Sequence, residues 1–292
     1  TTGTIYKSLD ESQYDNDGEV YYFAGNPTDN WVQFGGYWWR IIRINGNGSI
    51  RMIYQGTSAN TTGEGTQIGT SAFNTSYNDN VYVGYMYGTA GSSSYEATHA
   101  NTNNSTIKQE LDNWYSNISG LTSYSQYLDG SAGFCGDRYP STSSSTSNGQ
   151  GGTGTTQTFY GGDIRLLYES NKLPTFRCKN DSDLYTTNGS SEGNGALTYP
   201  IGLISMDEVW FAGSTWDTAN PSYYLYTGQY YWTISPSSFP DAVVYQVYTT
   251  GRLNTSVVHG SWGIRPVINL KADVTITGSG TTTDPYTVEG AA

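Results

Sequence analysis

The strongest structural signal in the sequence is the segment Tyr37-Trp-Trp-Arg-Ile-Ile-Arg-Ile44, followed by Asn45-Gly46-Asn47-Gly48 and then by Ser49-Ile-Arg-Met-Ile-Tyr54. Two apolar segments joined by an Asn-Gly turn predict a β-hairpin, because such turns need residues that accept a positive φ. Aromatic or aliphatic side chains occupy nearly every position from 38 to 44, interrupted by Arg40 and Arg43. We therefore expect this strand to be covered on both faces.

Further strands are predicted on both sides of this hairpin. They lie in residues 19–24, the part of 31–44 that precedes Tyr37, 230–236, 242–248, 253–259, 263–270 and, weakly, 275–288. Pro236 is expected to end its strand, because proline cannot donate to a sheet ladder. The turn Thr249-Thr-Gly-Arg252 makes the two strands around it a second hairpin. Short strands separated by turn residues favour a β-rich domain.

Two helices are predicted among these strands. The first spans about residues 105–118, with Ser105 or Asn104 as its N-cap. Its apolar residues recur at spacings of four, three and four, which places them in one stripe that faces the core. This stripe consists of Ile107, Leu111, Trp114 and Ile118. The second helix spans residues 205–213, where Ser205 and Glu208 form a capping box and Gly213 ends the helix.

The composition excludes several classes of protein. Charged residues make up 13% of the chain, and 13 Lys and Arg against 25 Asp and Glu give a net charge of −12. A nucleic-acid partner is therefore not expected, because such binding needs a basic face. No run approaches 18 apolar residues, so we expect no membrane span. The abundance of Tyr, Ser, Thr, Asn and Gly is typical of extracellular binding surfaces, where tyrosine supplies rigid contact area and small polar residues supply hydrogen bonds.

The chain has two cysteines, Cys135 and Cys178, with 42 residues between them. This spacing matches no metal-binding pattern, and His99 and His259 complete no zinc site. Low charge and a Ser/Thr/Asn-rich surface favour an oxidising compartment, and hence one disulfide. Two unpaired thiols are the alternative. The low-complexity segment 139–158 lies between the cysteines, so we expect it to be a surface loop within one domain.

The sequence offers no recognisable catalytic constellation. It has no nucleophile elbow, no phosphate-binding loop and no dinucleotide fingerprint. We therefore expect no enzymatic activity, no cofactor and no metal ligands. A weak Ca²⁺ site is the one alternative, because Asp15-Asn16-Asp17-Gly18-Glu19 and Asn180-Asp181-Ser182-Asp183 gather carboxylates at turns. Neither segment matches the twelve-residue calcium loop, and solvated turns are the simpler interpretation.

Several segments carry a resemblance to a known family. Tyr231-Trp-Thr-Ile-Ser-Pro236 and Gly263-Ile-Arg-Pro-Val-Ile-Asn-Leu270 resemble the end of C-type lectin-like domains in bacterial surface and pilin-like proteins, which are related to the formylglycine-generating enzyme. Segments 37–46, 84–88, 111–114 and 199–204 also resemble phrases of that group. The resemblance covers most of residues 20–275, with 1–19 as an N-terminal extension and 276–292 as a Thr/Gly tail. It implies an α+β fold of C-type lectin-like type, with a small twisted mixed or antiparallel sheet, two short helices and long ordered loops.

The same ending resembles the variable region of proteins diversified by retroelements. In that group, adenine-directed mutagenesis scatters residues over a ligand-binding face just before the last strand. Here the corresponding stretch is 240–262, which the resemblance therefore implies to be a hypervariable binding surface. The chain departs from the enzyme relatives because it lacks a nearby C-terminal cysteine pair, which argues against oxidase chemistry.

The residues of this stretch support a binding face independently. Leu253 and Val257 are expected to point inward, and Trp262 beside Tyr248 and Arg252 has the composition of a binding hot spot. A surface hairpin without a ligand, with Trp262 half buried, is the alternative. The predicted ligand-binding residues are Asp241, Tyr245, Tyr248, Thr250, Arg252, Asn254, Ser256, His259, Ser261 and Trp262. We predict a structural part for Arg265, whose planar fork would tie the last strand to loop carbonyls or a carboxylate.

These observations favour a secreted, extracellular or cell-surface module that binds a protein or glycan on another cell, a phage or a host surface. Two alternatives remain open. The chain could be a structural subunit of a pilin-like filament, in which residues 1–20 or 275–292 pair with the sheet edge of a neighbour. It could also be an enzyme of the formylglycine-generating type, which would need a reactive thiol.

Overall fold

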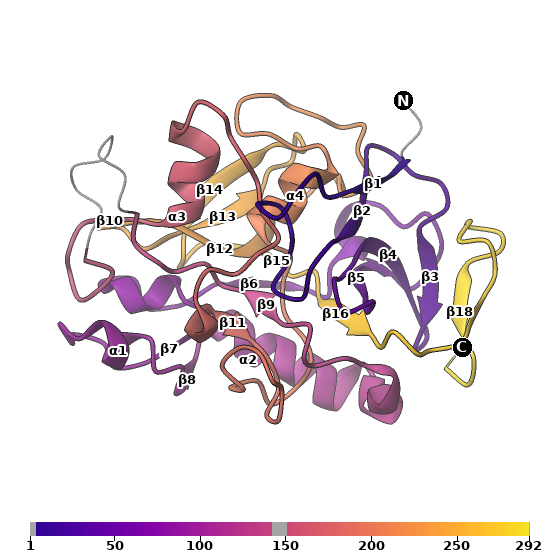
Figure 1. Cartoon of the computed structure of the whole chain (residues 1–292), viewed down its shortest axis with the longest axis horizontal. Helices are drawn as coiled ribbons and strands as arrows, with labels where there is room; N and C mark the ends of the chain where they lie inside the picture. Colours follow the sequence, from indigo (N-terminus) through magenta and orange to yellow (C-terminus); the bar gives the residue numbers. More distant parts are fainter. Residues whose placement is uncertain (1–3, 142–150, 292) are drawn as a thin grey trace.

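The computed structural model describes residues 4–141 and 151–291, and the chain is α+β, as predicted. Most of its regular structure is β, divided between an eight-stranded and a six-stranded sheet and two short strand pairs rather than one small sheet. Figure 1 shows the two large sheets with short helices around them. The centre of the predicted low-complexity loop, residues 142–150, lies outside the described residues.

The first sheet is built around β4 (Tyr37–Ile44). The predicted hairpin is confirmed, because β4 pairs antiparallel with β5 (Ile50–Gly56) across the Asn-Gly turn. On its other edge, β4 pairs with one strand near its start and with another near its end. The remaining strands are β1 (Thr4–Lys7), β2 (Tyr21–Ala24), β3 (Trp31–Phe34), β16 (Val267–Leu270), β17 (Ile276–Thr277) and β18 (Tyr286–Val288).

Both ends of the described chain belong to this sheet. Strand β1 pairs antiparallel with β2, and β18 pairs parallel with β3. The described parts of the predicted N-terminal extension and C-terminal tail are therefore hydrogen-bonded to strands of the domain itself.

The second sheet contains the other predicted hairpin. Strands β13 (Val243–Val247) and β14 (Leu253–Val257) pair antiparallel around the turn at residues 248–252, which confirms that prediction. The sheet continues through β12 (Tyr231–Phe239), β15 (Ser261–Gly263) and β6 (Thr70–Ala72), and β10 (Thr158–Phe159) pairs with β12. The two short pairs are β7 (Met86–Tyr87) with β8 (Asn103–Asn104) and β9 (Phe134–Cys135) with β11 (Leu184–Tyr185).

The prediction that Pro236 ends its strand is wrong, because β12 continues to Phe239. The register of β12 against β13 shifts on both sides of Pro236. Such an irregularity is where a sheet tolerates a residue without a backbone N–H.

The helices are short. The α-helices are α1 (Tyr95–Thr98), α2 (Thr106–Asn113), α3 (Gly161–Asp163) and α4 (Met206–Ala212), with π-helical turns at Trp114–Ile118 and Ile164–Tyr168 and 3₁₀ turns at Gly63–Thr66, Asn80–Val83, Leu121–Tyr127 and Asp181–Asp183. The predicted caps of both main helices are present, including the capping box of Ser205 and Glu208.

The apolar stripe of the first helix is confirmed at three of its four positions. Ile107, Leu111 and Trp114 are buried, but Ile118 is 63% exposed. Ile118 ends the π-helical turn that follows α2. Because this turn takes more residues than an α-helical turn, a residue four places further on no longer continues the stripe.

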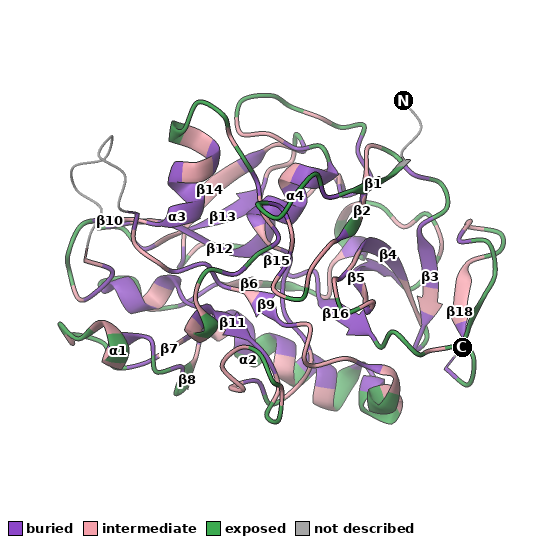
Figure 2. Cartoon of the chain, viewed as in Figure 1, coloured by how far each residue is buried: buried purple, intermediate pink, exposed green. Residues whose placement is uncertain are grey.

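Helix α4 joins the two sheets. The Glu208 carboxylate contacts Arg43 of β4 and Arg51 of β5, and the main-chain N–H of Met206 donates to Ser235 of β12. Figure 2 shows α4, β4, β5 and β12 largely in the colour of buried residues. The core therefore lies where this helix and the two sheets meet.

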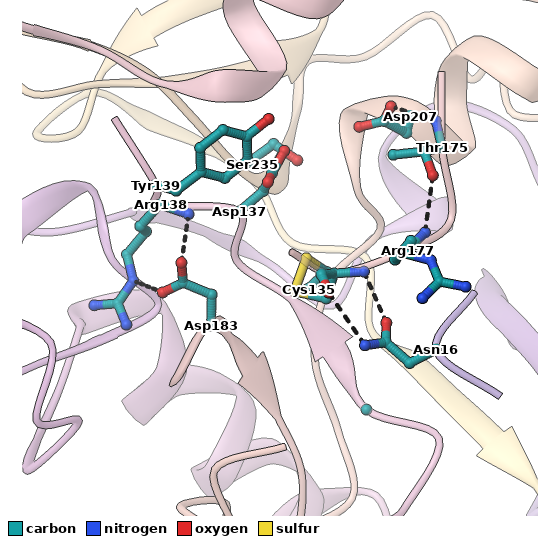
Figure 3. Close-up of a disulfide and its surroundings, with 12 residues drawn as sticks. Asn16, Cys135, Asp137, Arg138, Tyr139, Thr175, Arg177, Asp183, Asp207 and Ser235 are labelled. Atoms are coloured by element: carbon teal, nitrogen blue, oxygen red, sulfur yellow. Dashed lines mark hydrogen bonds and ion pairs between the residues drawn. A yellow bond between two sulfur atoms is a disulfide. The ribbon is translucent and has the colours of Figure 1, made fainter. Parts of the chain in front are cut away.

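The predicted disulfide between Cys135 and Cys178 is present, with 5.4 Å between the two Cα atoms. Asn16 holds the same region, because its side-chain amide donates to the Cys178 carbonyl and accepts from the Cys178 N–H (Figure 3). The disulfide thus ties β9 to the segment around Cys178, and the hydrogen bonds of Asn16 hold the N-terminal loop against that segment. No helix within residues 4–141 and 151–291 is long and apolar enough to cross a membrane.

Candidate ligand-binding surface

The structure brings most of the predicted binding residues to the surface of the second sheet. Asp241, Thr250, His259 and Ser261 are exposed, and Tyr248, Arg252, Asn254, Ser256 and Trp262 are partly exposed. Tyr245 is a correction. It is fully buried, and its hydroxyl donates to the buried Asp163 carboxylate. Side chains alternate between the faces of a strand, so Tyr245 points to the opposite face from Tyr248.

Four side chains form a continuous row on this surface, which we call the aromatic row: Arg252, Tyr248, Tyr230 and Trp262. The Tyr230 ring lies 4.6 Å from Tyr248, edge to face, and 4.6 Å from Trp262. The Arg252 guanidinium lies 5.2 Å from the centre of the Tyr248 ring. A hydrogen bond with the Tyr248 hydroxyl raises the pKa of Tyr230. The row therefore presents a cation and three aromatic rings, all supported by mutual contact.

Tyr230 is missing from the residues predicted to bind. It immediately precedes β12, whose Tyr231 pairs with Val247 of β13. The same register places Tyr230 beside Tyr248. The predicted strands 230–236 and 242–248 could have identified Tyr230 as a neighbour of Tyr248 only if their register had been known.

The aromatic row is held from several sides. The indole N–H of Trp262 donates to the Ser256 hydroxyl over 2.8 Å, which ties β15 to β14. Beyond Trp262, the exposed His259 ring lies 4.7 Å from the ring of Tyr77. Most of the side chains that could meet a ligand thus sit on strands or on short turns between them.

The metal-site and enzyme alternatives depend on carboxylate and cysteine side chains elsewhere in the described residues. No group of three or more His, Cys, Asp or Glu side chains there is placed to hold a metal ion. In the two segments considered for Ca²⁺, Asp15 contacts Arg43 over 3.0 Å and Asp183 contacts Arg138 over 2.8 Å. Both cysteines are in the disulfide, so neither supplies the reactive thiol that the enzyme alternative needs.

Sequence reasoning also missed a buried ionic network between α4 and the sheets. Arg165 contacts Asp207 over 2.7 Å and Asp137 over 3.0 Å. Burial raises the pKa of Asp207 in spite of the Arg165 charge. For Glu208, burial would also raise the pKa, but Arg51 and Arg43 lower it below its ordinary value. These groups neutralise one another inside the fold, and we assign them to its stability.

Comparisons with known proteins identify no relative. No protein-family model, no curated protein and no solved structure matches the chain.

Proposed function

We propose that the chain is an extracellular ligand-binding module of C-type lectin-like type and that the aromatic row is the centre of its binding surface. The observation that carries this proposal is the contact of three aromatic rings and one arginine on an accessible sheet surface. Tyrosine, tryptophan and arginine supply most of the energetically important contacts in protein interfaces. Asn254 and Ser256 lie beside the row on β14 and provide hydrogen-bonding groups around it.

The strongest support for this proposal is that the side chains of the aromatic row are already held in place. Trp262 is fixed by its bond to Ser256, and Tyr230 lies between the rings of Trp262 and Tyr248. A ligand would therefore not have to order these side chains, and little of the contact energy would be lost on binding.

The experiment is a screen of an array of surface proteins and glycans with the native chain and with a triple variant, Tyr248→Ala, Arg252→Ala and Trp262→Ala. We expect the triple variant to bind at least about 100-fold more weakly, since each truncated hot-spot residue costs tenfold or more. Arg252→Gln keeps most of the side-chain packing and should lose about tenfold by itself.

Tyr168→Ala is the matched control, because Tyr168 is 55% exposed and lies outside the row. It should leave binding unchanged. A ligand that binds the native chain and the triple variant equally well, while both keep the same melting temperature, would refute the proposed surface.

The proposal includes diversification of residues 240–262. Substitutions at the partly exposed Tyr248, Asn254 and Trp262 disturb the core less than substitutions at Tyr245 or Leu253, which are buried. Sequences of close siblings should vary at the former positions and keep the latter apolar or aromatic. Variation spread evenly over both sets would contradict this part of the proposal.

A filament built by strand pairing has less support. The described parts of the two segments expected to pair with a neighbour, β1 and β17–β18, are already paired within the chain. Because β1 and β17 are the end strands of this sheet, a neighbour would have to add to their outer edges.

A further inference from the structure

A second recess, separate from the aromatic row, lies beside the first sheet. It is a cavity of about 290 Å³ between the ends of β3, β4 and β5, the loop at residues 60–62 and the segment 221–226. We call it the Arg40 groove. Its volume is just below the usual range of small-ligand sites, about 300–1,000 Å³. The lining residues that matter below are Trp31, Arg40, Asn60, Ser222, Tyr224 and Tyr226.

Arg40 is a buried cation without a carboxylate partner. It is 5% exposed, and it donates from Nε to the Asn30 side chain over 2.6 Å and from Nη2 to the Pro27 carbonyl over 2.8 Å. Its guanidinium lies 4.0 Å from the centre of the Trp31 ring. Within residues 4–141 and 151–291, no carboxylate lies within ion-pair distance of Arg40, and Nη1 makes no hydrogen bond. Buried charges are ordinarily paired, so this one has room for an anion.

The ring of Tyr224 lines the groove beside Arg40. The Arg40 guanidinium lies 5.3 Å from the centre of this ring. The Tyr224 hydroxyl has no hydrogen-bond partner among the described residues, but it is itself buried, so a ligand in the groove does not reach it. Arg40 is therefore the donor that this part of the groove offers to an anion.

A second buried guanidinium reinforces the positive charge. Arg265 donates to the Gln55 side chain, which lines the groove, and to the carbonyls of Tyr54 and Leu225, and it too lacks a carboxylate partner in the described part of the chain. Burial lowers the pKa of Arg40 to about 9, and the Arg265 charge acts in the same direction, while Tyr224 and Asp29 oppose it. Arg40 remains protonated at neutral pH, and the groove carries a positive charge in a chain whose net charge is −12.

We propose that the Arg40 groove binds an acidic sugar, with the sugar carboxylate at Nη1 of Arg40, which makes no hydrogen bond among the described residues. A guanidinium is a suitable donor to a carboxylate, since charge-assisted hydrogen bonds are the stronger kind. The rest of the lining supports a sugar over a peptide carboxylate. Pro221 is its only aliphatic side chain, and the others are aromatic rings, amides and hydroxyls that suit a ring bearing hydroxyl groups.

The groove and the aromatic row share one segment of chain. Residues 221–226 line the groove, and the same segment continues to Tyr230. The inference does not depend on the proposed function, because neither Arg40 nor Tyr224 contacts the aromatic row.

The experiment is isothermal titration of the whole chain with glucuronic acid, glucose, acetate and a short peptide with a free C-terminus. Glucuronic acid should bind at least tenfold more tightly than glucose, which lacks the carboxylate, and more tightly than acetate or the peptide, which lack the sugar ring. The proposal is overturned if glucuronic acid and glucose bind equally well, or if glucuronic acid does not bind at about 10 mM. Equal binding of acetate, the peptide and glucuronic acid would overturn the assignment to a sugar.

Arg40→Gln removes the charge from the groove and should abolish glucuronic acid binding. The matched control is Tyr168→Phe, which should bind like the native chain. Native affinity in Arg40→Gln would refute the assigned donor. Arg40→Gln also removes packing on Trp31, so its melting temperature is measured as well. If this variant does not fold, the comparison of glucuronic acid with glucose on the native chain decides.

Discussion

Replacing Glu208 by glutamine should destabilise the protein strongly, although the two side chains have almost the same shape. The Glu208 carboxylate is 97% buried and contacts Arg43 over 3.0 Å and Arg51 still more closely. Glutamine can keep the capping box with Ser205, since its side chain also accepts from the N-cap N–H. The substitution therefore removes one negative charge and leaves the helix cap in place.

The magnitude follows from what remains around the two arginines. Removing one partner of a buried ion pair costs about 3–5 kcal/mol, because the other charge stays buried. Arg43 would retain Asp15 at 3.0 Å, so the lower end of this range applies to the free energy of unfolding. With an unfolding entropy of about 2.1 cal/mol/K per residue, ~3 kcal/mol corresponds to a melting temperature lower by about 5 °C.

The pH dependence of stability provides a second, independent test of the same prediction. Arg51 and Arg43 lower the pKa of Glu208 in the folded state, against the effect of burial, so its stabilising contribution is complete above the unfolded pKa of about 4.5. The contribution is lost as the pH falls through the lower, folded-state pKa. The difference in stability between the native chain and Glu208→Gln should therefore shrink below pH 4.5.

Urea unfolding at pH 7 and at several lower pH values measures both effects, with equal m-values as the check that the unfolded states are comparable. Glu110→Gln is the matched control, because Glu110 is an exposed glutamate on α2. A loss below about 1 kcal/mol for Glu208→Gln, or a loss equal to that of the control, would refute the reasoning.

Three further predictions concern single features of the fold. Replacing Cys135 and Cys178 by serine should cost about 4 kcal/mol of unfolding free energy for a sequence separation of 43, seen as a melting temperature lower by about 6 °C in calorimetry. Tyr245→Phe should cost about 1–3 kcal/mol in urea unfolding, because it deprives the buried Asp163 of a hydrogen-bond donor; a neutral result would show that this bond contributes nothing. Ile118→Gln should change the free energy of unfolding by less than about 0.5 kcal/mol, since Ile118 is 63% exposed. A larger loss would show that Ile118 packs in the core.

The local part of the fold was predictable because its signals are short-range. The Asn-Gly turn after Ile44 and the capping box of Ser205 and Glu208 each act within a few residues, and both are present. The disulfide was also predictable, but from composition and compartment rather than from geometry. These features need no knowledge of distant contacts.

The features that sequence reasoning missed depend on contacts far apart in the chain. The sequence left open which side of its strand Tyr245 faces, because valines occur on both faces. In the structure Tyr245 faces the side on which the buried Asp163 lies, 82 residues away in the chain. Similarly, Arg43 donates to Glu208, which lies 165 residues further along the chain. No local pattern encodes such pairs.

The candidate binding surface was predictable in part for the same reason. Tyr248 and Trp262 were recognised from their composition within one hairpin region, whereas Tyr230 lies just before the neighbouring strand β12 and required the sheet register. The groove at Arg40 was beyond reach, because its lining comes from three regions of the chain, around residues 26–55, 60–62 and 221–226.

The buried arginines fall into two groups, those paired with a carboxylate and those without one, and the unpaired group indicates where an anion could bind. Each of the four that hold the helices and sheets together has a carboxylate within 3.0 Å: Arg43, Arg51, Arg138 and Arg165. Acidic residues outnumber basic ones by 25 to 13, so the chain has acidic side chains to spare. Arg40 and Arg265 nevertheless meet only carbonyl and amide oxygens and aromatic rings in the described residues. A protein that pairs its other buried arginines but leaves uncompensated charge beside an open cavity has a site for an anion from outside.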